Sequence, residues 1–296
     1  MPHPYIGRLA PSPTGLLHLG HAATFWQAFL RARKHNGTLL LRNEDLDPQR
    51  SKPDYVEAMI EDLAWLGIAW QPPIISQSER TNLYRASLNQ LLQQGDIYPC
   101  TCSRKDLARM MHAPHEDSAV APDPDDEPVY PGICRPRVQQ QREVPFQPGV
   151  NYRLRAPDST SVTFTDLNLG PQSFTPGKDF GDFLVWRRVL SDHPNDTGLP
   201  SYQLACVVDD ADTQITEVVR GRDLLKSTAR QILLQRVLNL PTPNYFHTRL
   251  LVDEHGLRLA KRHDSLAIRN LRQQGLSPTQ VLQMASGRMT TVTSDS

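Results

Sequence analysis

The sequence predicts an α/β fold built around a parallel β-sheet, and the order of its first elements supports this prediction, while length, composition and charge limit the size and class of the protein. Residues 5–41 alternate strand-like, loop-like and helix-like patterns in the order of a βαβ unit. The chain has 296 residues, 39% hydrophobic and 22% charged, so it can bury a core as one large domain or two modest ones. Lys+Arg and Asp+Glu number 32 each, and this zero net charge disfavours a protein that coats nucleic acid, although local basic patches are allowed.

The βαβ unit begins with residues 5–10, an apolar run typical of a short buried strand. Residues 11–15 are expected to form a loop, because two prolines remove backbone donors and a glycine permits unusual dihedral angles. Apolar residues then recur at helical spacing over 19–30. A second apolar strand follows over 38–41, so the two strands should be parallel and joined by a right-handed crossover.

The rest of the chain continues to alternate helices and strands. Helical patterns cover 53–67 and 80–95, and each ends at a glycine, as helix C-termini prefer. The segment 110–128 is acidic, rich in proline and nearly free of large apolar side chains, which is typical of a mobile surface loop. Residues after 287 are expected to fray. Further strands are expected over 150–156, 161–165, 204–208 and 213–219, and further helices over 223–238 and 264–274.

The four cysteines are too few for a disulfide framework in a chain of this length. Cys100, Cys102 and Cys134 lie close in the sequence, which in a cytosolic protein indicates a metal site before a disulfide. Cys206 falls in the expected strand 204–208 and is interpreted as a buried small hydrophobe. Because we find neither a signal peptide nor an apolar run long enough for a membrane helix, we expect a cytoplasmic protein without membrane contact.

A histidine motif, His18-Leu19-Gly20-His21, stands where the first loop meets the first helix. Free backbone N–H groups and the positive end of the helix dipole make such a place suitable for phosphates. Gly20 permits a nucleotide to approach the backbone closely, and both imidazoles can donate hydrogen bonds to phosphate oxygens in a transition state. Taken alone, the motif is also compatible with two surface histidines at a helix start.

Four blocks of sequence, in order, resemble the glutamyl/glutaminyl branch of the class I aminoacyl-tRNA synthetases. They are residues 8–15, 18–21, 42–47 with Arg50, and 207–210 followed by 217–224. The resemblance runs from about residue 5 to about residue 285 and implies a Rossmann-type class I synthetase catalytic domain with a parallel sheet, interrupted by a small zinc-containing insertion. The expected parts are residues 1–98 and 166–256 as the two halves of the catalytic domain, 99–165 as the insertion with its acidic loop, and 257–296 as an ATP loop and short helical tail.

The resemblance also implies roles for single residues. It places a free amino acid between cationic and anionic side chains, and this agrees with the chemistry of glutamate, which brings two carboxylates and one ammonium. Structural ion pairing is the alternative for these charged residues. The implied glutamate-binding residues are Arg8, Ala10, Ser12, Glu44, Tyr202 and Arg220; the implied ATP-binding residues are His18, Gly20, His21, Arg258 and Lys261; and catalysis is assigned to His18, His21 and Lys261.

The ATP loop departs from the family pattern, a Lys-Met-Ser-Lys-Ser sequence that closes over ATP. Residues 257–262 align with it, and Lys261 matches the second lysine. Arg258 keeps the charge of the first lysine, whereas Ala260 replaces the serine and removes a hydroxyl contact. We therefore expect a changed rate of loop closure rather than a lost reaction.

The cysteine cluster is similar to the structural zinc site of this family. Three thiolates suit tetrahedral Zn²⁺ but need a fourth ligand, and the resemblance points to Tyr130 beside Cys100, Cys102 and Cys134. His112 and His115 are the alternative fourth ligands, and a relative that kept its thiols but lost the metal is the alternative to zinc itself.

Only 34 residues follow Arg262 (296 − 262), so we expect no anticodon-binding domain, because a domain needs at least roughly 50 residues. Short relatives that share this feature are the glutamyl-queuosine tRNA(Asp) synthetases. The resemblance implies a monomer that activates L-glutamate with ATP and Mg²⁺, without tRNA, and transfers it to the queuosine base in the anticodon of tRNA(Asp). The alternatives are a truncated glutamyl-tRNA synthetase that charges tRNA(Glu), half of a split enzyme, and a non-catalytic nucleotide-binding paralogue, which Ala260 favours.

Overall fold

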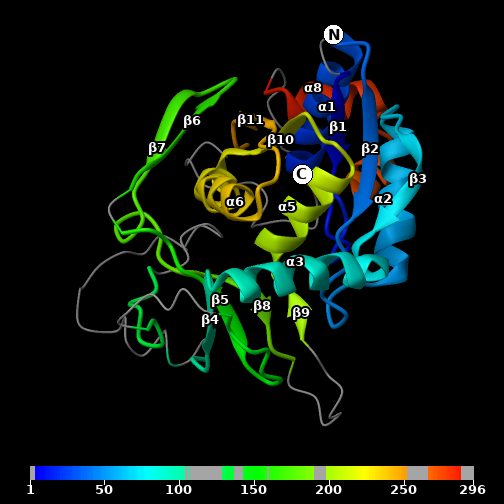
Figure 1. Ribbon diagram of the computed structural model, residues 1–296. Coiled ribbons are helices and arrows are strands. Elements are labelled where there is room, and N and C mark those ends of the chain that lie inside the picture. The colour runs from blue at the N-terminus through cyan, green and yellow to red at the C-terminus, as the bar shows by residue number, and fades with distance from the viewer. Residues whose placement is uncertain are drawn as a thin grey trace, which may run out of the picture. The chain divides into compact units, whose positions relative to one another are not determined.

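The computed structural model describes residues 4–103, 106, 129–136, 143–158, 160–189, 198–251 and 266–287. The chain forms two compact units (Figure 1). The first unit contains residues 1–79, 215–222 and 243–296, and the second contains 80–214 and 223–242. The division into catalytic halves, insertion and tail that the sequence predicts stays a prediction.

Parallel strands form the framework of the first unit, as predicted. The strands β1 (Ile6–Leu9), β2 (Thr38–Asn43) and β3 (Gln71–Ser76) are neighbours in that order, and both pairs are parallel. The strands β10 (Glu217–Gly221) and β11 (Asn244–Thr248) form a second parallel pair. The carboxyl ends of β1 and β2 are therefore at one edge, where ligands bind in open parallel sheets.

Four helices of the first unit fall among the described residues: α1 (Leu19–Lys34), α2 (Pro53–Trp65), α7 (Ile268–Gln273) and α8 (Pro278–Ala285). The first of these, α1, packs on β1, β2, β10 and α8. Its apolar face joins the core of the unit, which also takes residues from the strands and from the other helices. Members of this core include Leu9, Phe25, Leu41, Leu63, Ile268 and Val281.

In the part of the chain that the structure describes, the second unit contains antiparallel strands and three α-helices. One sheet has the order β4 (Ile97–Cys100), β5 (Asn151–Leu154), β8 (Phe183–Arg187) and β9 (Leu199–Pro200), with antiparallel pairs throughout. The strands β6 (Val162–Asp166) and β7 (Gly170–Phe174) form a hairpin. The helices are α3 (Thr81–Gln94), α5 (Tyr202–Asp212) and α6 (Leu225–Leu238), and two short 3₁₀ turns, η1 (Gln77–Arg80) and η2 (Arg222–Leu224), complete the described elements.

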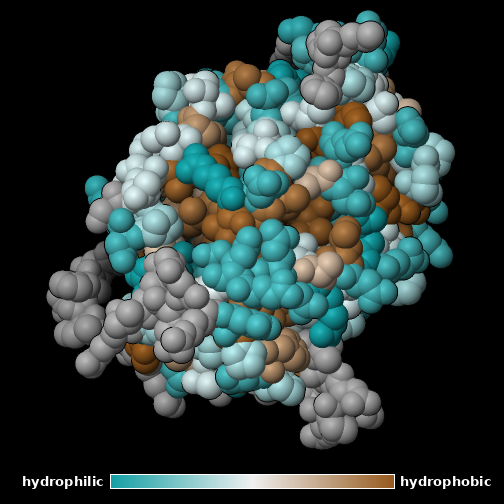
Figure 2. Space-filling model, viewed as in Figure 1, coloured by the Kyte–Doolittle hydropathy of each residue, from teal (hydrophilic) through white to brown (hydrophobic). Residues whose placement is uncertain are grey.

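The helix α3 shows why its sequence predicted a helix. Its buried residues recur at helical spacing, while its outer face is hydrophilic (Figure 2). The helix ends at Gly95, whose φ of 74° is the left-handed conformation that the glycine was expected to supply. Gly67 has the same φ just after α2. Exposed polar residues of α3 are Asn82, Asn89, Gln93 and Gln94.

The predicted strand over 204–208 is wrong, because these residues belong to α5. Every residue from Leu204 to Asp210 is buried, so this part of the helix has no solvent-exposed face and shows no amphipathic pattern. A short run that is apolar on all sides cannot be assigned by periodicity alone. The Ser201 side chain, which accepts a hydrogen bond from the backbone N–H of Leu204, caps the start of the helix. Cys206 is buried as expected, but on a helix.

None of the helices in the described part of the chain has the length and apolar character that crossing a bilayer requires. The predicted acidic loop 110–128 lies outside the described residues.

Candidate active site

Charged residues gather where the parallel strands of the first unit end. Arg8 lies on β1, Glu44 directly follows β2, and Arg220 lies near the end of β10. They are only 5%, 8% and 4% exposed. Arg8 Nη1 donates to the carbonyl oxygen of Val219 at 3.2 Å, which ties the end of β1 to β10 beside Arg220. The structure therefore brings two predicted cations to one edge of the unit.

Glu44 has a partner that the sequence-based assignment missed. Arg42 Nη2 donates to Glu44 Oε1 at 3.1 Å, and both side chains are buried. The signal was available, because residues two apart at a strand end point to the same side. The backbone N–H of Glu44 also donates to the carbonyl oxygen of Pro11 at 3.1 Å, which holds the loop after β1. Within that stretch Ala10 is half-buried and Ser12 is exposed.

Arg220 also has neighbours that were not predicted. Its Nε donates to Nε2 of His247 at 3.4 Å, and its guanidinium carbon lies 5.5 Å from the centre of the Tyr245 ring. His247 is the direct partner of Arg220 in the parallel pair β10–β11 and is fully buried. This contact depends on a long-range strand pairing, so no local pattern in the sequence reveals it.

The two motif histidines cap α1 with their side chains. The backbone N–H of Gly20 donates to His18 Nδ1 at 3.1 Å, and the backbone N–H of His18 donates to His21 Nδ1 at 3.2 Å. The imidazole rings stack with their centres 3.8 Å apart. A Cβ on Gly20 would lie 3.0 Å from the His18 ring, so the glycine leaves room for this ring to fold back.

This arrangement fixes which ring nitrogens can donate. Both Nδ1 atoms accept hydrogen bonds, so each neutral imidazole carries its proton on Nε2. Burial, and after it the neighbouring His18, lowers the pKa of His21 to about 3. His21 is therefore a neutral N–H donor near pH 7. Directed Nε2–H groups at a helix N-terminus suit phosphate oxygens.

For the other predicted site residues, the structure gives a partial description or none. Tyr202 belongs to the second unit, where it opens α5 and is 37% exposed, so its part in an amino-acid pocket stays a prediction. Arg258, Ala260 and Lys261 lie outside the described residues. Soon after them, however, Ala267 pairs with His18, and the backbone N–H of Ile268 donates to the carbonyl oxygen of Leu17 at 2.8 Å.

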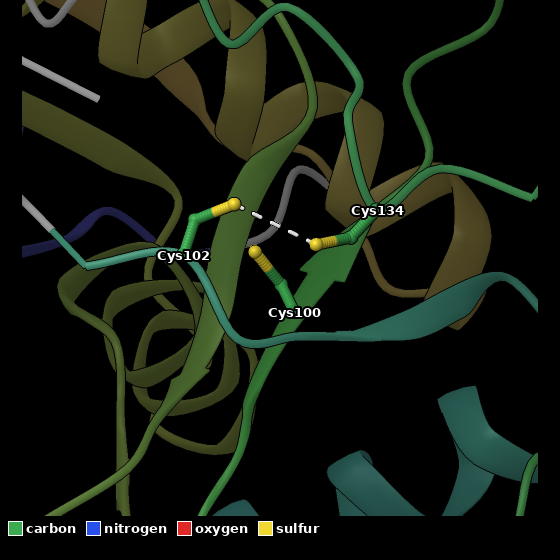
Figure 3. Close-up of side chains that lie close together, drawn as sticks. All are labelled: Cys100, Cys102 and Cys134. Carbon is green, nitrogen blue, oxygen red and sulfur yellow. Dashed lines mark hydrogen bonds between the residues drawn. The ribbon is translucent and has the colours of Figure 1, made fainter. Parts of the chain in front are cut away.

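The cysteine cluster lies in the second unit, where the three sulfur atoms point toward one another (Figure 3). The Sγ atoms of Cys100, Cys102 and Cys134 lie within 4.8 Å of one another. The hydroxyl of Tyr130 is 3.6 Å from the sulfur atoms of both Cys100 and Cys102, and it accepts a 2.9 Å hydrogen bond from the backbone N–H of Cys134.

These four side chains fit a metal ion. Three sulfur atoms and one oxygen converge on one small volume, and soft thiolate ligands favour tetrahedral Zn²⁺. The Tyr130 hydroxyl is placed among the thiols as the fourth donor. The alternative donors, His112 and His115, lie outside the described residues.

Comparisons with known proteins identify the family of this chain. Residues 6–296 match the family described as tRNA synthetases class I (E and Q), catalytic domain. A glutamyl-Q tRNA(Asp) synthetase of Symbiobacterium thermophilum is 43% identical over 286 residues, covering 93% of this chain and 84% of the relative. A protein of the same name from Rhodobacter capsulatus is 40% identical over 285 residues, covering 93% of this chain and 98% of the relative.

Solved structures show the same fold. The glutamate-tRNA synthetase of Elizabethkingia anophelis superposes with a TM-score of 0.69 at 24% identity, and the glutamate tRNA ligase of Elizabethkingia meningosepticum with a TM-score of 0.67 at 23% identity. Each match covers 93% of this chain but only 54% of the solved chain. The chain therefore belongs to the class I tRNA synthetases, in the glutamate and glutamine group that contains the glutamyl-Q tRNA(Asp) synthetases.

Proposed function

We propose that this enzyme activates L-glutamate with ATP, without tRNA, and transfers the glutamyl group to the queuosine base in the anticodon of tRNA(Asp). The observation that carries the proposal is the 40–43% identity, over 89–95% of the chain, to relatives that are all named glutamyl-Q tRNA(Asp) synthetase. A ligase of this kind acts on substrates found in the cytoplasm, which is where we place it.

The buried charges suit glutamate as the amino acid. In the proposal, Arg8 and Arg220 bind its two carboxylates and Glu44 accepts from its ammonium group, with Ala10, Ser12 and Tyr202 lining the pocket. The bond from Arg8 to the Val219 carbonyl and the ion pair from Arg42 to Glu44 support these roles, because they hold the side chains before substrate arrives. A neutral amide in place of the side-chain carboxylate would offer a buried guanidinium an uncharged and therefore weaker hydrogen-bond acceptor.

The first reaction is a displacement at phosphorus. A carboxylate oxygen of glutamate attacks the α-phosphorus of ATP, the bond to the bridging oxygen breaks, and pyrophosphate leaves with the electron pair. No general base is needed, because the nucleophile is already ionised. The Nε2–H groups of His18 and His21 donate to phosphate oxygens as negative charge builds, and Arg258 and Lys261 are assigned to the same phosphates. Bound Mg²⁺ would offset phosphate charge.

The second reaction passes glutamate to the tRNA. A hydroxyl oxygen of the cyclopentene-diol of queuosine attacks the carbonyl carbon of glutamyl-adenylate, the hydroxyl proton is released, and AMP leaves with the electron pair of the broken bond as the new ester forms. We also propose that Cys100, Cys102, Tyr130 and Cys134 hold one structural Zn²⁺. The convergence of three sulfurs and a hydroxyl supports this site.

Acylation with labelled glutamate tests the proposal. The enzyme should glutamylate tRNA(Asp) that carries queuosine, and periodate oxidation of the queuosine diol beforehand should abolish the ester. Queuosine-free tRNA(Asp) is the matched control and should accept nothing. Efficient charging of unmodified tRNA(Glu) at its 3′ end would instead identify a short glutamyl-tRNA synthetase.

A further inference from the structure

A buried arginine stands against the cysteine cluster. Arg153 lies on β5 and is only 3% exposed. Its Nε lies 3.3 Å from the sulfur of Cys100, to which it donates. Its guanidinium carbon lies 3.9 Å from the centre of the Tyr130 ring. One side chain therefore contacts two of the four proposed metal ligands, one through a sulfur atom and one through an aromatic face.

A hydrogen bond to Asp182 holds the arginine in this position. Its Nη1 donates to the backbone carbonyl oxygen of Asp182 at 2.9 Å. The Asp182 carboxylate is fixed in turn, because it accepts from the Tyr98 hydroxyl at 2.5 Å and from the backbone N–H of Ala156 at 2.9 Å. A guanidinium that is anchored in this way needs no rearrangement to contact the ligands.

The charge of the loaded centre explains what such a cation would do. Three thiolates and a phenolate carry four negative charges, and a divalent cation leaves a net charge of −2 in a buried place. A buried charge is costly unless it is paired. One guanidinium reduces the excess to −1, through an N–H to sulfur hydrogen bond and through its position over the electron-rich ring.

We propose that Arg153 is a positioning residue for the metal centre, which orients Cys100 and Tyr130 and offsets the negative charge of the loaded site. The inference rests on the proposed zinc site and is independent of which tRNA accepts glutamate. Partners that orient metal ligands typically raise metal affinity by roughly 10- to 100-fold, so Arg153 should contribute on this scale.

Zinc affinity, measured by competition with a chromophoric chelator, tests the inference. Arg153→Met should weaken Zn²⁺ binding by roughly 10- to 100-fold. The zinc affinity of Arg153→Lys should lie between those of Arg153→Met and the unmodified protein. An ammonium keeps the positive charge, but it is not planar and cannot stack on the Tyr130 ring as a guanidinium does. The matched control is Arg155→Met, since Arg155 lies two residues further along and reaches the Pro136 carbonyl oxygen rather than a ligand.

A second readout separates this role from a general contribution to folding. The rise in Tm on adding Zn²⁺ to metal-free protein should shrink in Arg153→Met and stay unchanged in Arg155→Met. If Arg153→Met lowers Tm equally with and without Zn²⁺ and keeps its zinc affinity, the inference is wrong. If the methionine variant fails to fold, Arg153→Lys decides, and an unchanged affinity in that variant also overturns the inference.

The ligand contact can be isolated with Tyr130→Phe, which keeps the ring beneath the guanidinium but removes the oxygen. The fold-loss in affinity caused by Arg153→Met should be smaller in the Tyr130→Phe background, because the charge to be offset is smaller. Absence of zinc binding by the unmodified protein would overturn both the zinc site and this inference. The proposal that the enzyme glutamylates tRNA(Asp) is tested by a separate measurement, and the absence of zinc would not contradict it.

Discussion

Single residues at the start of α1 combine two tasks that are usually separate. His18 and His21 replace the serine and glutamate of an ordinary capping box, so their Nδ1 atoms accept from backbone N–H groups and their ring protons are carried on Nε2. Alanine substitutions would therefore mix a loss of capping with a loss of chemistry. Asparagine separates the two effects, because it is among the best N-cap residues and has no imidazole.

We predict that His18→Asn keeps the stability of the protein but lowers the rate of glutamyl-adenylate formation by roughly tenfold to a thousandfold, the effect of one lost oxyanion-type donor. His18→Ala should lose similar activity and also lose roughly 0.5–2 kcal/mol of stability. Thermal unfolding and ATP–pyrophosphate exchange of both variants provide the measurement. An asparagine variant with normal exchange would remove His18 from the mechanism.

Arg220 is expected to contribute directly to the binding of glutamate. Arg220→Met should lower kcat/KM for glutamate by roughly 10- to 150-fold, which corresponds to the loss of one charged hydrogen bond. Arg222→Met is the control, since Arg222 lies two residues away and is exposed. In the unmodified enzyme, exchange with glutamine or aspartate should be far slower than with glutamate. Equal rates with glutamine would contradict the assigned role of the two arginines.

The sequence indicates which charged residues belong to the site better than it indicates the residues that they contact. The charged residues Arg8, Glu44 and Arg220 are recognisable because they stand in motifs near strand ends. Arg42, the partner of Glu44, lies only two residues away. In contrast, His247, the partner of Arg220, is brought in by pairing between distant strands, and such a contact leaves no local pattern.

Among the elements, α2 carries an unusual buried acid. Asp62 is fully buried, and neither carboxylate oxygen has a hydrogen-bond partner among the described residues. Burial raises the pKa of Asp62 to about 6, although Arg269 and Arg272 on α7 act to lower it. Arg269 instead bonds to Glu61, and Arg272 lies over the Trp65 ring.

Because of Asp62, the free energy of unfolding should change with pH in a predictable direction. Its folded pKa of about 6 exceeds the ordinary 3.8, so the folded state binds more protons between these values, and stability falls as pH rises through this window. Asp62→Asn removes the charge and should raise stability at pH 7, on the order of 1–3 kcal/mol. The gain should shrink toward pH 4, where Asp62 is already protonated.

Thermal unfolding between pH 4 and pH 7 measures this difference. The control is Glu57→Gln, an exposed acid on the same helix, which should show no comparable gain. A gain from Asp62→Asn that is equal at pH 4 and pH 7 would mean that the buried charge is not its source.

The segment before β8 makes a further prediction. A Cβ on Gly181 would lie 2.7 Å from the backbone nitrogen and 2.9 Å from the carbonyl oxygen of Tyr130, closer than any tolerated contact. Gly181→Ala should therefore push Tyr130 away from the thiols and weaken zinc binding. Gly15→Ala, with open space at its Cβ, is the control. Unchanged metal content in Gly181→Ala would show that Tyr130 is not held by this contact.

Across the whole molecule, helices and strands were predicted correctly where apolar and polar residues alternate regularly. The prediction failed where a segment is buried on all sides and has no such alternation. The βαβ start and the amphipathic α3 follow from alternation of apolar residues with loops and polar faces. The helix α5 was missed because burial on all sides erases its period. The metal cluster was predicted from cysteine spacing, yet Arg153, which contacts it, lies on a strand 53 residues after Cys100.

In the complete reaction, activation of glutamate should not depend on tRNA. Activation without tRNA requires an amino-acid site that is already arranged before tRNA binds. Here the bond from Arg8 to Val219 and the ion pair from Arg42 to Glu44 already exist in the chain alone. Glutamate-dependent ATP–pyrophosphate exchange should therefore proceed without tRNA, and adding queuosine-containing tRNA(Asp) should not raise its rate. Queuosine-free tRNA serves as the control for non-specific effects. Exchange that begins only when tRNA is added would show that the site is completed by the nucleic acid, because the preformed contacts would then be insufficient to orient glutamate.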